Sequence, residues 1–422
     1  MIDTYQRVCY FIKNSALNLL FWVFSEVSSE GKEDGSLLGE LRLRYERLSK
    51  LERNKKAIVE RMKNLARNNF APRAENYDTT ATFPGDNIDD LFQVSLHAPT
   101  IPQSYGGLGL GPQCGDPLTL WLMTKEIAKV DLSLAQLWEE HANALVLLDG
   151  MASEKQKSVW FQEIVDECKI WVVWDTEPQA NALGTTSFAT VAKPVESGYI
   201  VDATKEFCIG ANGANWAILV ASESDSEEDV LLLACDLSDP SISIDKDRWD
   251  PLGMRAAVSH KVHFKKTFIP TANVIGRKGQ YTTEAWQSRL LPNRAASLLG
   301  AAKAAYEHAV TYIKAQKKTQ DPSIQEQIAQ IAIHIETGDL WLTHTAEKWR
   351  ENPKEAQLTS GYGFHTIENL VEDTLKRCIH ACGAGILNRP SPIERIYRDL
   401  PFYIHRNEHN LARMGKAILG EL

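Results

Sequence analysis

The chain has 422 residues, 44% of them hydrophobic, and carries a formal net charge of −9. That length exceeds one small core and fits two or three packed domains. The acidic balance argues against a nucleic-acid partner, because binding a phosphate backbone generally needs a basic face. The seven cysteines are scattered and form no CxxC pair, so we predict reduced thiols, no metal site and a cytoplasmic protein.

The first 36 residues are predicted to be an N-terminal extension. Apolar residues gather between positions 9 and 24, but Lys13 and Asn14 interrupt the run before it could span a bilayer, so we predict no transmembrane span. Two interpretations stay open: an amphipathic helix that packs on the body or on a partner subunit, and a signal or membrane segment. The polar stretch 28–36 is predicted to be a linker.

Residues 37–168 are predicted to form an N-terminal α-helical domain. Apolar residues three or four apart predict a long surface helix over 37–69 and helical structure over 116–150. Between these segments, the glycine-rich stretch 100–111 predicts a turn. Ser153 followed by Gln156 has the pattern of a capping box at the start of the next helix.

Residues 169–278 show a different pattern, typical of β-strands. Short runs rich in Val, Ile, Trp and Phe are separated by Gly, Pro, Asn and Ser. The expected strands are 170–174, 188–192, 199–202, 216–221, 230–235, 242–244 and 261–264. Strands at this spacing predict a small β-barrel or sandwich.

Residues 279–422 return to helical spacing, most clearly over 295–314, 324–350 and 366–382. The chain therefore runs from helices to strands and back to helices. Segregated elements argue for separate α, β and α layers and against a doubly wound nucleotide-binding sheet.

The chain resembles the acyl-CoA dehydrogenase superfamily in five motifs. In chain order they are 69–74 with 101–109, 153–157, 174–178, 205–216 and 249–276. The resemblance implies an α+β, acyl-CoA dehydrogenase-like fold with an N-terminal helical domain, a middle β-barrel and a C-terminal four-helix bundle. It also implies a homotetramer around that bundle, or a homodimer.

A flavin is the cofactor that the resemblance implies, either FAD or reduced FMN. The ring system needs backbone N–H donors and a hydroxyl at its pyrimidine edge, and flat apolar cover on its faces. By resemblance, Val173, Trp174, Asp175 and Thr176 supply the donors, with the Thr176 hydroxyl toward the ring. Phe207 stands where the dehydrogenases place a tryptophan against the flavin.

Other positions of the implied cofactor site depart from the family pattern. Ile209 replaces a Ser or Thr whose hydroxyl reaches the reactive flavin nitrogen, so Cys208 or the main chain through Gly210 would have to substitute. Lys317, beside Gln316, stands near the place of an arginine that binds the FAD pyrophosphate from a neighbouring subunit; lysine lacks the bidentate fork. Small residues that let backbone N–H groups approach this pyrophosphate are Gly383 and Ala384.

The base needed for dehydrogenation is missing at the positions that the resemblance assigns to it. Removal of hydride from an acyl-CoA needs a carboxylate that takes the α-proton. With Arg398-Asp399 aligned to the family's dipeptide, Asn407 replaces the usual glutamate, and an amide cannot act as that base. Some relatives carry the base on the helix at 289–300, which has no acid here. The neighbouring Glu408 is one residue off the expected position, and it is either a base or a surface acid.

The run 205–216 is closer to the monooxygenase branch of the superfamily, which resembles dibenzothiophene monooxygenase. Those proteins take reduced flavin from a separate reductase and need a polar pocket more than a strong base. His405, Arg406 and Asn407 near the C-terminal end could donate hydrogen bonds in such a pocket. His141 on an expected helix is a further candidate donor, with a satisfied core histidine as the alternative.

These observations favour a flavin-dependent oxidoreductase. The first hypothesis is a monooxygenase or oxidase that acts through a reduced-flavin oxygen adduct on a small organic substrate. One alternative is a divergent acyl-CoA dehydrogenase with Glu408 as its base. The other is a non-catalytic binding protein on the same fold.

Overall fold

The computed structural model describes residues 53–175, 190–224, 226–247, 249–404 and 410–419, and the described residues from 57 onward form one compact unit. The predictions for the N-terminal extension, for Thr176 and for His405, Arg406, Asn407 and Glu408 lie outside the described residues. In the described ranges, no helix combines the length and the apolar character that a bilayer crossing demands.

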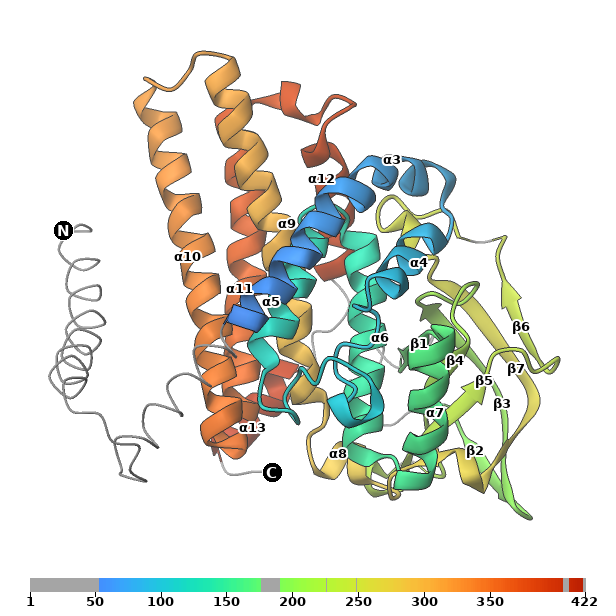
Figure 1. Ribbon diagram of the computed structural model, residues 1–422. Coiled ribbons are helices and arrows are strands. Elements are labelled where there is room, and N and C mark those ends of the chain that lie inside the picture. Colours follow the sequence, from blue (N-terminus) through green and yellow to red (C-terminus); the bar gives the residue numbers. More distant parts are fainter. Residues whose placement is uncertain (1–52, 176–189, 225, 248, 405–409, 420–422) are drawn as a thin grey trace, which may run out of the picture. The chain divides into compact units, whose positions relative to one another are not determined.

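Helices build the first part of this unit (Figure 1). The helix expected before residue 69 is present over 57–65 and passes through a π-helical turn, Ala66–Phe70, into α3 (Ala71–Thr80). The helices that follow are α4 (Gly85–Gln93), α5 (Pro117–Ala128), α6 (Leu132–Met151) and α7 (Glu154–Glu167). The capping box of Ser153 and Gln156 is confirmed at the start of α7.

Two four-stranded sheets form the middle part. One has the order β1-β4-β5-β8 and the other β2-β3-β7-β6. The strands are β1 (Trp171–Trp174), β2 (Ala192–Val195), β3 (Gly198–Cys208), β4 (Trp216–Ser222), β5 (Val230–Asp236), β6 (Ile242–Asp245), β7 (His260–Pro270) and β8 (Val274–Ile275). Over the described residues these sheets do not close, so the predicted barrel is corrected to two sheets that share a core.

Strand β1 is buried on both faces because it lies between two apolar layers. Trp171 and Val173 face a core built with α6 and α7, whereas Val172 and Trp174 face the core between the sheets. The alternation follows from the two-residue period of a strand. Strands β3 and β7 run longer than the sequence predicts, because β-bulges after Val201 and Lys205 break the alternating pattern.

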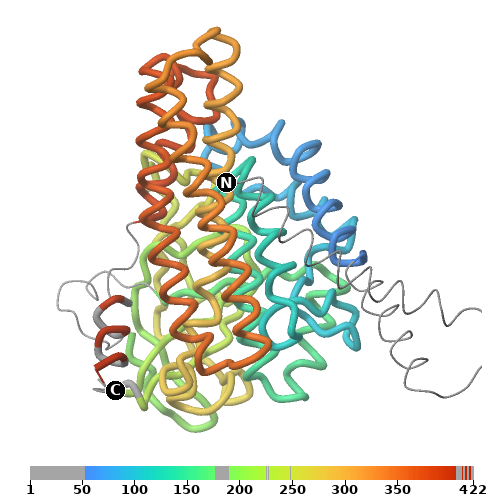
Figure 2. Tube along the Cα trace, turned by 90° about the vertical axis from the view of Figure 1, so that its left-hand side faces the viewer, coloured from blue at the N-terminus to red at the C-terminus, as the bar shows by residue number. Residues whose placement is uncertain are grey.

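Long helices form the C-terminal part. They are α9 (Gln287–Ala315), α10 (Pro322–Glu351) and α11 (Pro353–Cys382), preceded by the short α8 (Gln280–Thr283) and followed by α12 (Pro392–Ile404) and α13 (Asn410–Leu419). Figures 1 and 2 show α9, α10 and α11 side by side as a bundle, and α5 packs on α9. Gly300 permits that approach, because a Cβ there would stand 2.4 Å from the Lys125 carbonyl oxygen.

Candidate functional site

The end of β1 meets the bulged end of β3, so the fold brings the two expected flavin motifs together. The Trp174 indole N–H donates to the Ile209 carbonyl oxygen at 3.1 Å, and the Gly210 N–H donates to the Ala257 carbonyl at 3.0 Å. Gly210 has φ +69°, and a Cβ there would stand 2.6 Å from a Leu137 methyl group. Its backbone conformation and its packing therefore both favour glycine.

Phe207 is presented outward by the bulge between Lys205 and Cys208. Its φ is +54°, and its side chain is 45% exposed. The Phe402 ring, in the last turn of α12, lies edge-on to it with centroids 6.2 Å apart, and Trp249 lies edge-on to Phe402 at 5.9 Å. An exposed flat ring beside two further aromatic rings fits the apolar cover that a flavin needs.

The side chains of Cys208 and Ile209 are both buried, in different cores. Ile209 offers no hydroxyl, and its carbonyl already accepts the hydrogen bond from Trp174. Beside Cys208 on β7 lies His260, a buried residue that the sequence analysis missed. Neither ring nitrogen of His260 has a hydrogen-bond partner within the described part of the chain, and burial lowers its pKa. Orphaned buried nitrogens at this edge are compatible with a polar ligand.

The residues expected at the pyrophosphate gather elsewhere, at the end of the bundle where α9 and α11 finish. Lys317 is exposed and has φ +56°. Gly383 has φ +77°, and a Cβ on it would meet no atom within 4 Å, but its N–H caps α11 by donating to the Ile379 carbonyl. Ala384 follows Gly383 directly. Figure 1 shows this end of the bundle apart from β1 and β3. Within one chain the fold does not bring the two halves of the expected flavin site together.

His141, on α6, is buried against β1, and main-chain groups form hydrogen bonds with both of its ring nitrogens. Nδ1 accepts the Trp171 N–H at 3.1 Å, and Nε2 donates to the His97 carbonyl oxygen at 3.0 Å. Burial is the main cause that lowers the pKa of His141 to about 4, so the ring is neutral at pH 7. This geometry is that of a satisfied core histidine, and it leaves no N–H for a reacting oxygen.

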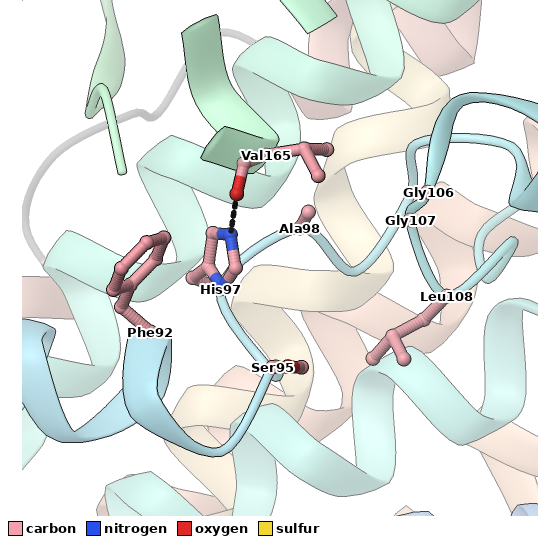
Figure 3. Close-up of a pocket in the computed structure, with 8 residues that line it drawn as sticks. All are labelled: Phe92, Ser95, His97, Ala98, Gly106, Gly107, Leu108 and Val165. Carbon is pink, nitrogen blue, oxygen red and sulfur yellow. Dashed lines mark hydrogen bonds between the residues drawn. The ribbon is translucent and has the colours of Figure 1, made fainter. Parts of the chain in front are cut away.

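A pocket of about 160 Å³ lies at the glycine-rich turn before α5 (Figure 3). His97 lines it, and its Nε2 is 3.2 Å from the Val165 carbonyl oxygen. The other lining residues are Phe92, Ser95, Ala98, Gly106, Gly107, Leu108 and Val165. None of them belongs to the expected flavin site or to the expected catalytic residues.

A buried carboxylate that the sequence analysis passed over lies where α6, α9 and α12 meet. Glu139 is 3% exposed, and its Oε2 accepts hydrogen bonds from the Ser297 hydroxyl at 2.9 Å and from the Tyr403 hydroxyl. One helix turn along, Asn143 accepts a 3.3 Å hydrogen bond from Asn293 of α9. The available signal was a pair of adjacent acids, Glu139 and Glu140, within a mainly apolar helix.

The Arg398-Asp399 dipeptide anchors α12 to the rest of the fold. Arg398 pairs with Asp78 at 2.7 Å and with Glu394 at 2.7 Å. Asp399 accepts the Met254 N–H at 2.6 Å, and burial raises the pKa of its carboxyl group to about 7. The dipeptide thus fixes α12 and does not itself offer an exposed catalytic group.

Three family models match the chain in order. They are the acyl-CoA dehydrogenase N-terminal domain over residues 52–167, the middle domain over 173–267 and the C-terminal domain over 284–404. Together they cover most of the chain.

Individual relatives include both dehydrogenases and a monooxygenase. The mitochondrial isovaleryl-CoA dehydrogenase of Arabidopsis thaliana is 25% identical over 82% of this chain and 85% of its own. FMN-bound TdsC of Paenibacillus sp. A11-2, a dibenzothiophene monooxygenase, has a TM-score of 0.77 at 21% identity over 87% of this chain and 98% of its own. Butyryl-CoA dehydrogenase of Megasphaera elsdenii has a TM-score of 0.78 at 19% identity over 86% of this chain and 98% of its own.

Proposed function

Because this chain belongs to the acyl-CoA dehydrogenase family, a superfamily of flavin-dependent oxidoreductases, we propose that it is a monooxygenase or oxidase on a small organic substrate. Reduced flavin, delivered by a separate reductase, would be its electron source. We also propose a cytoplasmic homotetramer or homodimer with domains over 37–168, 169–278 and 279–422.

The observation that carries this proposal is the side-chain chemistry of α9 opposite α6. Its buried polar residues there are Asn293, Arg294 and Ser297, and none is an acid. The acid at this junction, Glu139 of α6, is already engaged by Ser297 and Tyr403. Since Asn407 is an amide as well, both family positions for the base lack a carboxylate. Oxygen transfer to a nucleophilic atom does not need such a base.

The residues near Phe207 fit a flavin ring system. Phe207 would cover one face, and the chain from Val173 to Thr176 would hold the polar edge. The Gly210 main chain is left out of this set, because its N–H donates to the Ala257 carbonyl oxygen. Lys317, Gly383 and Ala384 would reach the phosphates of a flavin held by a second copy, since they lie at the end of the bundle. When bound, a reduced flavin supplies the electrons that activate molecular oxygen.

The chain's own residues would orient the substrate and exclude water. Phe402 and Trp249 extend the apolar surface beside Phe207, which favours a desolvated site. Phe402 precedes the segment His405–Asn407 by only a few residues, so we propose His405, Arg406 and Asn407 as hydrogen-bond donors to the reacting oxygen. His141 is omitted from this set, because its nitrogens bind main chain.

A divergent acyl-CoA dehydrogenase is the second candidate. The isovaleryl-CoA dehydrogenase match over 82% of the chain favours it. In that case the proposed base is Glu408, which follows Asn407.

The test is a titration of flavin-free protein with FAD and FMN, oxidised and dithionite-reduced, followed by turnover under ¹⁸O₂. Tighter binding of the reduced flavin and ¹⁸O in a heteroatom-containing product are the expected results. Tight binding of oxidised FAD that is bleached anaerobically by acyl-CoA compounds would replace the proposal with the dehydrogenase. Binding of neither flavin would leave a non-catalytic binding protein.

A further inference from the structure

Tyr403, in the last turn of α12, is held from two other helices. Its hydroxyl donates to Glu139 Oε2 of α6, and the same oxygen accepts the Ser297 hydroxyl of α9. The Tyr403 carbonyl oxygen accepts a 2.8 Å hydrogen bond from Arg294 Nη2, and the Arg294 guanidinium lies 5.1 Å from the centre of the Tyr403 ring. We name these four residues the Tyr403 clamp.

Packing α6, α9 and α12 through the clamp has a large desolvation cost. Tyr403 is fully buried, and Glu139 and Arg294 are nearly so. Burying a carboxylate or a guanidinium costs several kcal/mol unless partners satisfy it, and apolar residues of similar volume often pack as stably. Arg294 Nε even lacks a hydrogen-bond partner in the described part of the chain. A gain in stability alone is therefore a weak explanation for these side chains.

The hydroxyl of Tyr403 keeps its proton in this setting. Burial, followed by the charge of Glu139, raises the pKa of Tyr403 well above its ordinary value. The tyrosine therefore remains a donor across the physiological pH range, and the bond between α12 and α6 persists.

The position of the clamp links it to the flavin surface. Phe402 precedes Tyr403 directly, and its ring lies edge-on to both Phe207 and Trp249. Fixing Tyr403 therefore also fixes the point from which Phe402 reaches toward Phe207. A polar network has definite bond directions, so it specifies this placement more narrowly than apolar packing would.

We propose that Glu139 and Ser297 are positioning residues of the flavin site. Through Tyr403 they hold the last turn of α12, and with it Phe402, against the surface formed by Phe207 and Trp249. The inference rests on the proposed function only in placing a flavin at Phe207, and it applies equally to an oxygenase and to a dehydrogenase.

Three variants test the clamp: Tyr403→Phe, Glu139→Gln and the double variant. The matched control is Tyr199→Phe, which also removes a tyrosine hydroxyl from a glutamate, since Tyr199 donates to Glu223 at 3.0 Å in the β-sheet part. Amide hydrogen exchange of flavin-free protein would follow the last turn of α12. Flavin Kd, kcat and KM would be measured on the same proteins.

The expected result is faster exchange in the last turn of α12 for both single variants and not for Tyr199→Phe. We expect kcat to fall about tenfold or more, on the scale that small misplacements of a reacting group produce. Flavin Kd should change less than about threefold, because β1 and β3 hold the ring, and the double variant should be no worse than the worse single one. Thermal unfolding confirms that each variant folds.

Unchanged exchange in α12, or additive losses in the double variant, would overturn the inference. An equal loss of turnover in Tyr199→Phe would overturn it too. Absence of any flavin binding or turnover in the unaltered protein would instead defeat the proposed function, and the exchange measurement would still decide whether the clamp holds α12.

Discussion

Helix α6 carries two buried polar residues, Glu139 and His141, on opposite sides, and their hydrogen-bond partners differ in kind. Glu139 and His141 are two positions apart, about 200° around the helix, and each is 3% exposed. His141 binds main-chain groups of Trp171 and His97, whereas Glu139 binds side chains from α9 and α12. Glu139 and His141 are therefore equally buried but have different roles, and the difference lies in whether their partners are side chains or main chain.

The difference has a physical basis. A main-chain N–H and C=O have fixed places in the fold. The neutral His141 ring therefore connects α6 rigidly to β1 and to the chain at His97. A carboxylate shared by two hydroxyl groups instead joins α6 and α9 to the last turn of α12. Disturbing the first should affect the stability of the whole fold, and disturbing the second should affect the placement of α12.

The largest expected effect is on stability, for His141→Leu. Loss of the ring leaves the His97 carbonyl and the Trp171 N–H without these hydrogen bonds in a buried place. Each unsatisfied group costs about 1–3 kcal/mol, so the free energy of unfolding should fall by about 2–4 kcal/mol in urea titrations. His344→Leu, at an exposed position on α10, is the control and should change it by less than about 0.5 kcal/mol. Unchanged stability with loss of turnover would restore a chemical role for His141.

The next effect is a pH dependence in which two buried groups oppose each other. The raised pKa of Asp399, about 7, means that the folded protein holds this proton more tightly than the unfolded chain. Its contribution to stability is complete below about pH 4 and is lost as the pH rises to about 7, a change of about 2–4 kcal/mol. The lowered pKa of His141, about 4, acts in the other direction, with stability lost as the pH falls from about 6.5 to 4.

Asp399→Asn separates the two contributions. The variant should lose the Asp399 part of the slope, so that its unfolding free energy declines more steeply toward acid than that of the unaltered protein. Urea midpoints between pH 4 and 8 measure this difference. Parallel profiles for the two proteins would show that Asp399 does not titrate in this range.

Local patterns and family motifs made much of the fold predictable. The capping box at Ser153 needs only three residues of context, and β1 and the long helices have clear periods. The two-sheet arrangement was not resolved, because bulges in β3 and β7 disrupt the alternation on which strand prediction depends.

The role of Glu139 could not be predicted at all. Its partners Ser297 and Tyr403 are 158 and 264 residues away, and no local pattern reports which face of α6 they meet.

Phe207→Ala should weaken flavin binding while leaving the fold intact. The ring is half exposed in the flavin-free protein, so its removal should hardly change stability, but stacking contacts of this kind contribute about 0.5–1.5 kcal/mol. That predicts a flavin Kd about 3- to 10-fold higher, read from flavin fluorescence. Phe268→Ala on β7, where the ring is equally exposed, is the matched control and should leave the Kd unchanged. Equal losses in the two variants would remove Phe207 from the proposed site.

The smallest expected effect is the loss of stability in Ser297→Ala, which tests whether the Glu139 face of α6 contributes less to stability than the His141 face. Ser297→Ala removes one of the hydrogen bonds to Glu139 Oε2 but leaves the one from Tyr403 in place. A single neutral donor to a carboxylate that keeps another partner should contribute about 0.5–1 kcal/mol, well below the loss expected for His141→Leu. Urea unfolding would measure it, with Ser158→Ala on the exposed side of α7 as the control. If Ser297→Ala cost as much as His141→Leu, Glu139 would depend on Ser297 for its burial, and both faces of α6 would serve stability in the same way.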